Sequence, residues 1–295
     1  MNVLEECVLL LCCRLGDSTY KPLTLTQFRE LGLRVTSSLM GGNHLTHLSA
    51  RHLCDLGYEA QYADHIINLL DRRQIMENYL SRAETLGIRP FTRISYGYPQ
   101  QLCDKYGSSR PPVLFYLGDE SLLTRPGIAV VGSRDLHKDN EIFAATVGRK
   151  IAEEGFVLVS GGANGADMAA QQACLEAGGS CVIFTPHRLD KYRPNEKILY
   201  ISEDGYDLHF STARAFRRNK LIHMQASKTF TAQASFGKGG TWQGCTENLK
   251  HGWSDLFVYD DGSEAVNALV DLGATKLREV LSLHDLQRSQ QSLFD

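Results

Sequence analysis

The sequence has no C-x-x-C pair, no apolar run long enough to span a membrane, and no excess of positive charge. Its eight cysteines are scattered, several in apolar segments, which is typical of buried thiols in a reducing compartment rather than of a disulfide framework. The short apolar stretch at 8–13 follows Glu5 and Glu6 and lacks the length and basic flank of a signal peptide. We therefore expect a cytoplasmic protein that is not associated with a membrane.

Motifs of several enzyme classes are also missing. There is no G-x-x-x-x-G-K-[ST] run of a P-loop nucleotidase, no G-x-S-x-G nucleophile turn, and no H-E-x-x-H among the ten histidines. The turn at 132–134 has a single glycine and so differs from the G-x-G-x-x-G of dinucleotide-binding proteins. We expect no catalytic residue of these classes, no cofactor and no metal site.

The overall charge limits the kind of nucleic-acid site that the chain can carry. Of its 295 residues, 43% are hydrophobic and 22% charged, as in a globular protein with a substantial core, and the formal net charge is −3. A protein of this charge does not attract nucleic acid over its whole surface. A site for a polyanion must therefore be a local basic patch.

Hydrophobic periodicity divides the chain into three parts. Residues 1–85 show helical patterns, with glycines at 41–42 and 57 between them, and predict a small all-helical domain. This domain is either a SAM-like or helix-hairpin-helix-like module or a cap that packs on the main domain. Residues 86–275 start with short strands and turns, including a strand expected at 113–117 at or near a sheet edge. From 128 onward strands alternate with helices, which predicts an α/β domain with a mainly parallel sheet and helices on both faces. Residues 276–295 are polar and predict a loose tail.

Two glycine-containing turns follow neighbouring strands of the predicted sheet. The apolar runs at 128–131 and 156–159 end at 132–134 and 161–167, respectively. Open α/β sheets bind ligands at the edge where the carboxyl ends of their strands meet, and glycines there let backbone N–H groups approach an anion. Asp167 either faces that ligand or caps the following helix. The predicted phosphate-binding residues are Gly132, Ser133, Arg134, Gly161, Gly162, Asn164, Gly165 and Asp167.

Two later segments add candidates for the same edge. Four cations within 214–220 surround Phe216 at the start of a helix. They form either a solvated charged face or a set of phosphate contacts, with Phe216 or a neighbouring tyrosine stacked on a base. A further glycine-rich loop opens another helix, which Thr241 is predicted to cap while it also binds a phosphate oxygen. These candidates are Arg217, Arg218, Asn219, Lys220, Lys238, Gly239, Gly240 and Thr241.

The segments at 111–119, 128–134 and 160–167 resemble the DprA/Smf DNA-processing family in order and spacing. The resemblance implies an extended Rossmann-like fold that binds single-stranded DNA as a homodimer and, in transformation, loads the recombinase RecA, without catalytic activity. It identifies Arg134 with the family's pocket arginine. It also places 218–220 at an Arg-Asn-Arg run and matches the segment 189–195, which includes Lys191, to a Leu-Asp…Tyr-Pro…Asn segment.

The sequence departs from this family at its late glycine loop. That loop is closer to the Gly-Gly-x-Gly-Thr…Glu loop of lysine-decarboxylase-like (LOG) nucleotide phosphoribohydrolases, and no winged-helix segment is visible after it. An alternative function is therefore a nucleotide-binding sensor or a nucleotide hydrolase with Glu247 as its acid/base. A third is a scaffold whose helical domain mediates self-association.

Overall fold

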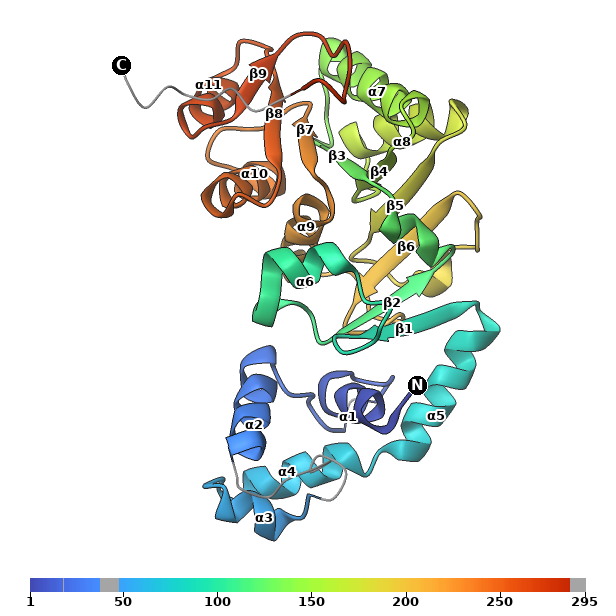
Figure 1. Ribbon diagram of the computed structural model, residues 1–295, viewed down its shortest axis with the longest axis vertical. Helices are drawn as coiled ribbons and strands as arrows, with labels where there is room; N and C mark the ends of the chain where they lie inside the picture. Colours follow the sequence, from blue (N-terminus) through green and yellow to red (C-terminus); the bar gives the residue numbers. More distant parts are fainter. Residues whose placement is uncertain (18, 38–47, 287–295) are drawn as a thin grey trace.

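The computed structural model describes residues 1–17, 19–37 and 48–286. The predicted glycine turn at 41–42 lies outside them. The chain begins with a group of helices that lie below the sheet in Figure 1: α1 (Val3–Cys12), α2 (Leu25–Ser37), α3 (Ala50–Asp55), α4 (Ala60–Leu70) and α5 (Arg73–Thr85). None of the described helices is long and apolar enough to cross a membrane.

The helical pattern at 60–83 is interrupted between α4 and α5. The buried guanidinium of Arg72 lies at this break and donates hydrogen bonds to the carbonyl oxygens of Leu10 and Cys13, at the end of α1. A cation suits a helix C-terminus because the last carbonyls there lack partners within the helix. The break thus lets α5 start in a new direction while Arg72 ties it to α1.

A nine-stranded sheet forms the centre of the molecule, in the order β1-β2-β6-β5-β4-β3-β7-β8-β9. Among the strands of the described residues, only the pairs β1–β2 and β2–β6 are antiparallel, so the expected mainly parallel sheet is confirmed. The strands are β1 (Ile88–Thr92), β2 (Val113–Leu117), β3 (Gly127–Val131), β4 (Val157–Ser160), β5 (Ser180–Phe184), β6 (Ile198–Glu203), β7 (Lys228–Thr231), β8 (Asp255–Tyr259) and β9 (Thr275–Leu277). The predicted strand at 113–117 lies next to the sheet edge; β1 and β9, which form the two edges, were not predicted.

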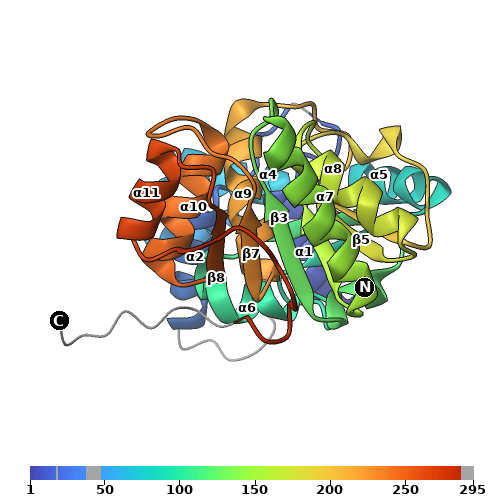
Figure 2. The same cartoon turned by 90° about the horizontal axis from the view of Figure 1, so that it is seen from above.

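Helices cover both faces of the sheet, as expected (Figure 2). Alternate residues of β3 face opposite layers: Ile128 and Val130 pack in a core with α7 (Lys138–Glu153) and α8 (Ala166–Glu176). Ala129 and Val131 pack in the core of the other face. That face is covered by α6 (Gln100–Tyr106), α9 (Thr212–Gln225), α10 (Gly239–His251) and α11 (Glu264–Asp271).

The strand order changes direction beside β3. From β3 the chain moves outward through β4, β5 and β6, and then returns to place β7 on the other side of β3. The connections that follow the strands on the two sides of such a point run to opposite faces of the sheet. This leaves a crevice between them at the carboxyl ends of the central strands. The turns after β3, β4 and β7 all lie at this crevice.

The predicted boundaries do not separate independent cores. The N-terminal helices share one buried cluster with β1 and β2, which includes Leu69, Phe115 and Tyr206. At the other end, the boundary at 275 falls within β9, and Val280 and Leu283 are buried against the α7–α8 face. The described part of the predicted tail, 276–286, is therefore packed and not loose.

Candidate nucleic-acid interface

A cavity of about 550 Å³ opens at the crevice between β3 and β7. It is lined by the turns after β3, β4 and β7 and by one face of α9, from Thr212 to His223. The structure thus brings together four segments that are far apart in the sequence. The predicted residues that line it are Gly132, Ser133, Arg134, Asp167, Arg218, Asn219, Lys238, Gly239, Gly240 and Thr241.

The turns after β3 and β4 touch through their backbones at Gly165. Its φ of +82° is in the region that favours glycine, and a Cβ added there would lie 2.2 Å from the carbonyl oxygen of Ser133. The same oxygen accepts a hydrogen bond from the N–H of Ala166 at 3.2 Å. Only glycine permits this contact, which joins the two turns into one wall of the cavity.

A buried ion pair also lines the cavity. The guanidinium of Arg218, on α9, is 4.0 Å from the carboxylate of Asp167, in the first turn of α8. Burial raises the pKa of Asp167, while Arg218 and the neighbouring backbone N–H groups oppose that rise. Burial also lowers the pKa of Arg218. Its Nε has no hydrogen-bond partner within the described chain, and buried donors of this kind usually have an acceptor.

Asp167 closes the second glycine turn. One of its carboxylate oxygens accepts hydrogen bonds from the N–H groups of Gly161 (3.1 Å) and Ala163 (3.2 Å). The turn was predicted to use such amides to bind an anion, but this carboxylate already occupies these two. Asp167 thus stabilises the turn and does not cap α8, whose N-cap is Gly165. Gly162 and Asn164 are exposed on the same turn and do not line the cavity.

Two exposed cations at the cavity, and a third near His187, have no carboxylate partner. The side chains of Arg134, Lys191 and Lys238 make no ion pair among residues 1–17, 19–37 and 48–286. Arg134 and Lys238 line the cavity. Lys191 lies close enough for its charge, with those of Arg218 and Arg134, to help lower the pKa of His187, an effect to which burial contributes most. The arrangement is a local basic patch on a protein of negative net charge.

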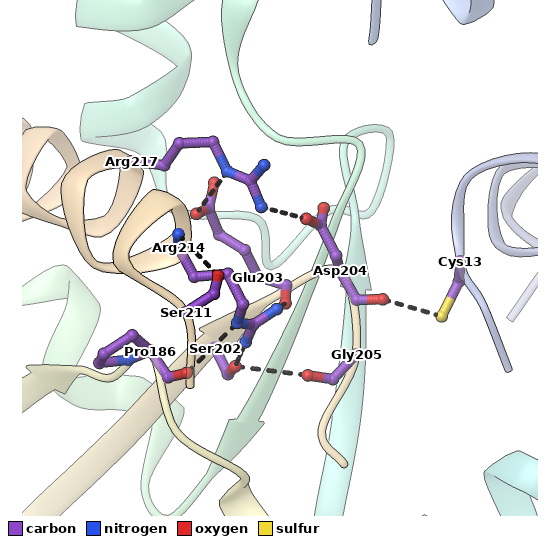
Figure 3. A network of polar contacts seen from close by, with 9 residues as sticks. All are labelled: Cys13, Pro186, Ser202, Glu203, Asp204, Gly205, Ser211, Arg214 and Arg217. Carbon is purple, nitrogen blue, oxygen red and sulfur yellow. Dashed lines mark hydrogen bonds and ion pairs between the residues drawn. The ribbon is translucent and has the colours of Figure 1, made fainter. Parts of the chain in front are cut away.

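The predicted cluster of cations on α9 is split between different faces. Arg217 forms ion pairs with Asp204 (2.6 Å) and Glu203 (3.6 Å) (Figure 3). It also lines a second cavity, of about 680 Å³. Lys220 pairs with Glu247 at 3.1 Å and lines neither cavity. Successive helix residues point about 100° apart, so residues 217, 218 and 220 cannot all face one ligand. The prediction that Arg217 and Lys220 join Arg218 at the cavity is wrong.

Glu247, the acid/base of the alternative hydrolase, also lies away from the cavity. Its carboxylate is held by Lys220, and Asp167 is the only carboxylate among the described residues that line the cavity. Glu247 is therefore not positioned to act on a ligand bound there.

Polar contacts tie α9 and α10 to the turn after β3. The hydroxyl of Thr241 donates a hydrogen bond to the carbonyl oxygen of Gly132 at 2.9 Å. The side-chain amide of Asn219 donates one to the carbonyl oxygen of Gly240 at 3.2 Å. The N-cap of α10 is Lys238, so the prediction that Thr241 caps this helix is wrong. Thr241 and Asn219 instead hold the cavity in shape.

Sequence reasoning missed three rings at or beside the cavity. Phe210 lines it and is 45% exposed, and its ring stacks on that of His187. Phe210 lies directly before the Ser211 that caps α9, close in sequence to the cation cluster, which was the available signal. His223 also lines the cavity, but burial lowers its pKa to about 4, so it is neutral at pH 7 and adds no charge. Phe216, predicted as a stacking residue, does line the cavity.

Comparison of the sequence with known proteins finds DNA-processing proteins of two bacteria. Over 221 residues the chain is 29% identical to DNA processing protein DprA of Streptococcus pneumoniae, covering 68% of this chain and 74% of that protein. It is 33% identical to protein Smf of Synechocystis over 97 residues, 31% of this chain and 24% of that protein.

Solved structures agree with the sequence matches. DprA of S. pneumoniae superimposes with a TM-score of 0.71 at 25% identity, covering 95% of this chain and 96% of that one. DprA of Helicobacter pylori, whose structure was described for its single-stranded DNA binding mode, gives a TM-score of 0.55 at 25% identity. The match covers 65% of this chain and 91% of that one. The DNA recombination-mediator protein A family matches residues 90–285. The chain therefore belongs to this family of DNA-processing proteins.

Proposed function

We propose that this protein binds single-stranded DNA at the cavity between β3 and β7, through contacts with the phosphates. The observation that carries the proposal is the charge of the cavity wall. Arg134, Arg218 and Lys238 line it, and its one described carboxylate, Asp167, is engaged by Arg218. This wall is positive although the protein has a net charge of −3, so it provides the local basic site that a polyanion needs.

The spacing of the cations favours a strand over a single nucleotide. Lys191 follows β5, Arg134 follows β3 and Lys238 follows β7, and these strands span three intervals of the sheet. Neighbouring strands are about 4.8 Å apart, so the ends of the strands that precede these cations span roughly 14 Å of the sheet edge. A ligand with several phosphates along its length can contact all of them.

The binding of labelled oligo-dT of several lengths, measured by fluorescence anisotropy at low salt, tests this proposal. A duplex of equal length and a panel of mononucleotides serve as comparisons. We expect affinity to rise with oligonucleotide length until the patch is covered, with weaker binding of mononucleotides. Failure to bind any oligonucleotide at low salt would overturn the proposal, and tighter binding of a mononucleotide would favour the nucleotide sensor instead.

We further propose that the protein delivers the bound strand to a RecA-type recombinase as a homodimer. Membership of the recombination-mediator family supports this step. The test is whether the protein accelerates recombinase ATP hydrolysis on DNA coated with a single-strand-binding protein. No acceleration, with DNA binding intact, would restrict the function to DNA binding.

A further inference from the structure

Phe210 presents an aromatic ring at the wall of the cavity. It belongs to the segment between β6 and α9 and keeps 45% of its surface exposed. Its ring stacks on His187, with the ring centroids 5.1 Å apart and the planes inclined by 24°. Single exposed apolar residues are common on protein surfaces, but this one lies in the wall that also holds Arg134 and Arg218.

The chemistry of the surrounding residues suits a nucleobase. Sites for single strands combine cations that follow the phosphates with aromatic rings on which bases stack. Here His187 supplies a flat support behind Phe210, and the charges of Lys191, Arg218 and Arg134 reach this imidazole. The ring pair thus lies among the cations that we assign to the phosphates.

The segment that carries Phe210 is held at both ends. At its start, the thiol of Cys13 donates to the carbonyl oxygen of Asp204 at 3.2 Å (Figure 3). Tyr79 then donates to the carboxylate of Asp207 at 2.7 Å. At its end, the hydroxyl of Ser211 accepts from the N–H of Arg214 and caps α9. The N-terminal helices thus fix the loop before any ligand binds, which reduces the entropy lost on binding.

We propose that Phe210, supported by His187, is a base-stacking residue for the strand bound in the cavity. The inference rests on the proposed function and adds to it that affinity depends on the bases as well as on the phosphates. Because every base offers a π-face, the contact is tolerant of sequence.

The test compares oligo-dT with an abasic oligonucleotide of the same length and charge, for the wild-type protein, Phe210→Ala and Phe210→Trp. We expect Phe210→Ala to weaken the binding of oligo-dT on the order of tenfold, because the bases of oligo-dT stack on the ring. The affinity for the abasic strand, which has no bases to stack, should not change. Phe210→Trp should restore the affinity for oligo-dT. Phe236→Ala is the matched control, since Phe236 is 47% exposed and does not line the cavity.

The outcomes separate this inference from the proposed function. If the wild-type protein binds neither oligonucleotide, both are overturned. If it binds both, and Phe210→Ala binds oligo-dT as tightly as the wild type, only the stacking role is overturned. Equal losses for oligo-dT and the abasic strand would also overturn it, because they would show that the substitution disturbs the loop and not a contact with a base.

Discussion

The guanidinium of Arg218 lies 4.0 Å from the carboxylate of Asp167, and both side chains are buried. This pair joins α9 to the glycine turn after β4. The turn after β4 also contacts the turn after β3, through Gly165. The ion pair and the backbone contact at Gly165 together connect the three segments that form one side of the cavity.

Gly161 gives the Arg218 guanidinium its space. A Cβ on residue 161 would lie 1.2 Å from the nearer Nη of Arg218, a position that no buried arginine can keep. We expect Gly161→Ala to lower the free energy of unfolding by roughly 1–3 kcal/mol, as overpacking of a core does, and to weaken DNA binding. Urea unfolding and anisotropy measure the two effects.

Gly32→Ala is the matched control for that substitution. Gly32 lies within α2, and an added Cβ there would have no atom within 4 Å. Alanine is the better helix former, so we expect this variant to be more stable by about 0.5–1 kcal/mol. If Gly161→Ala is as stable as the wild type, the close packing of Arg218 on the turn is not as described.

Removal of the buried Asp167 carboxylate should lower the free energy of unfolding more than removal of a less buried carboxylate. Asp167→Ala leaves the buried Arg218 unpaired and takes the acceptor from two backbone N–H groups. Breaking a buried ion pair typically costs about 3–5 kcal/mol. Asp260→Ala, which breaks a partly exposed pair with the exposed Arg278, should cost no more than about 1 kcal/mol. Equal losses in urea unfolding would contradict a structural role for the Asp167 pair.

Glu203 makes stability depend on pH. Burial and the neighbouring Asp204 raise its pKa from 4.5 to about 7, although Arg217 and Arg214 oppose the rise. The folded protein therefore holds this proton more tightly than the unfolded chain, and the stability that Glu203 contributes is lost as pH rises from about 4.5 to about 7. We expect the wild type to lose stability relative to Glu203→Gln over this interval, with no further change above it. A difference between the two proteins that is independent of pH would show that Glu203 has no raised pKa.

Salt dependence distinguishes free cations from paired ones. Each phosphate contact of a single strand contributes about 0.7 to the slope of log affinity against log salt. We expect Lys191→Gln and Lys238→Gln each to reduce this slope by about that amount. Arg217→Gln and Lys220→Gln should leave it unchanged, because acidic partners already neutralise these charges. A reduced slope for Arg217→Gln or Lys220→Gln would show that this residue contacts a phosphate after all.

Backbone features of the site could be predicted from the sequence. Apolar runs that end in glycine turns indicate parallel strands, and the carboxyl ends of parallel strands meet at one edge. The convergence of the turns at Gly132 and Gly165 follows from this rule alone. The strand–helix alternation from residue 128 onward likewise predicted the layers of the fold.

Side-chain partners could not be predicted in the same way. Asp204 and Glu247 meet Arg217 and Lys220 only because β6, α9 and α10 pack together, so composition could not show that these two cations are neutralised. The break at Arg72 has a similar origin, since its partners are carbonyl oxygens at the far end of α1. Interactions between distant segments decided each of these outcomes.

Charge reversal at Arg134 tests whether the cavity between β3 and β7 is the DNA site. Arg134 is exposed and lines the cavity, and it has no ion-pair partner within the described chain, so Arg134→Glu should leave thermal unfolding unchanged. Anisotropy titration of oligo-dT at low salt should then show binding by the wild type and none by the variant. Equal affinity of the two proteins, with the variant folded, would contradict the assignment of this cavity as the DNA site.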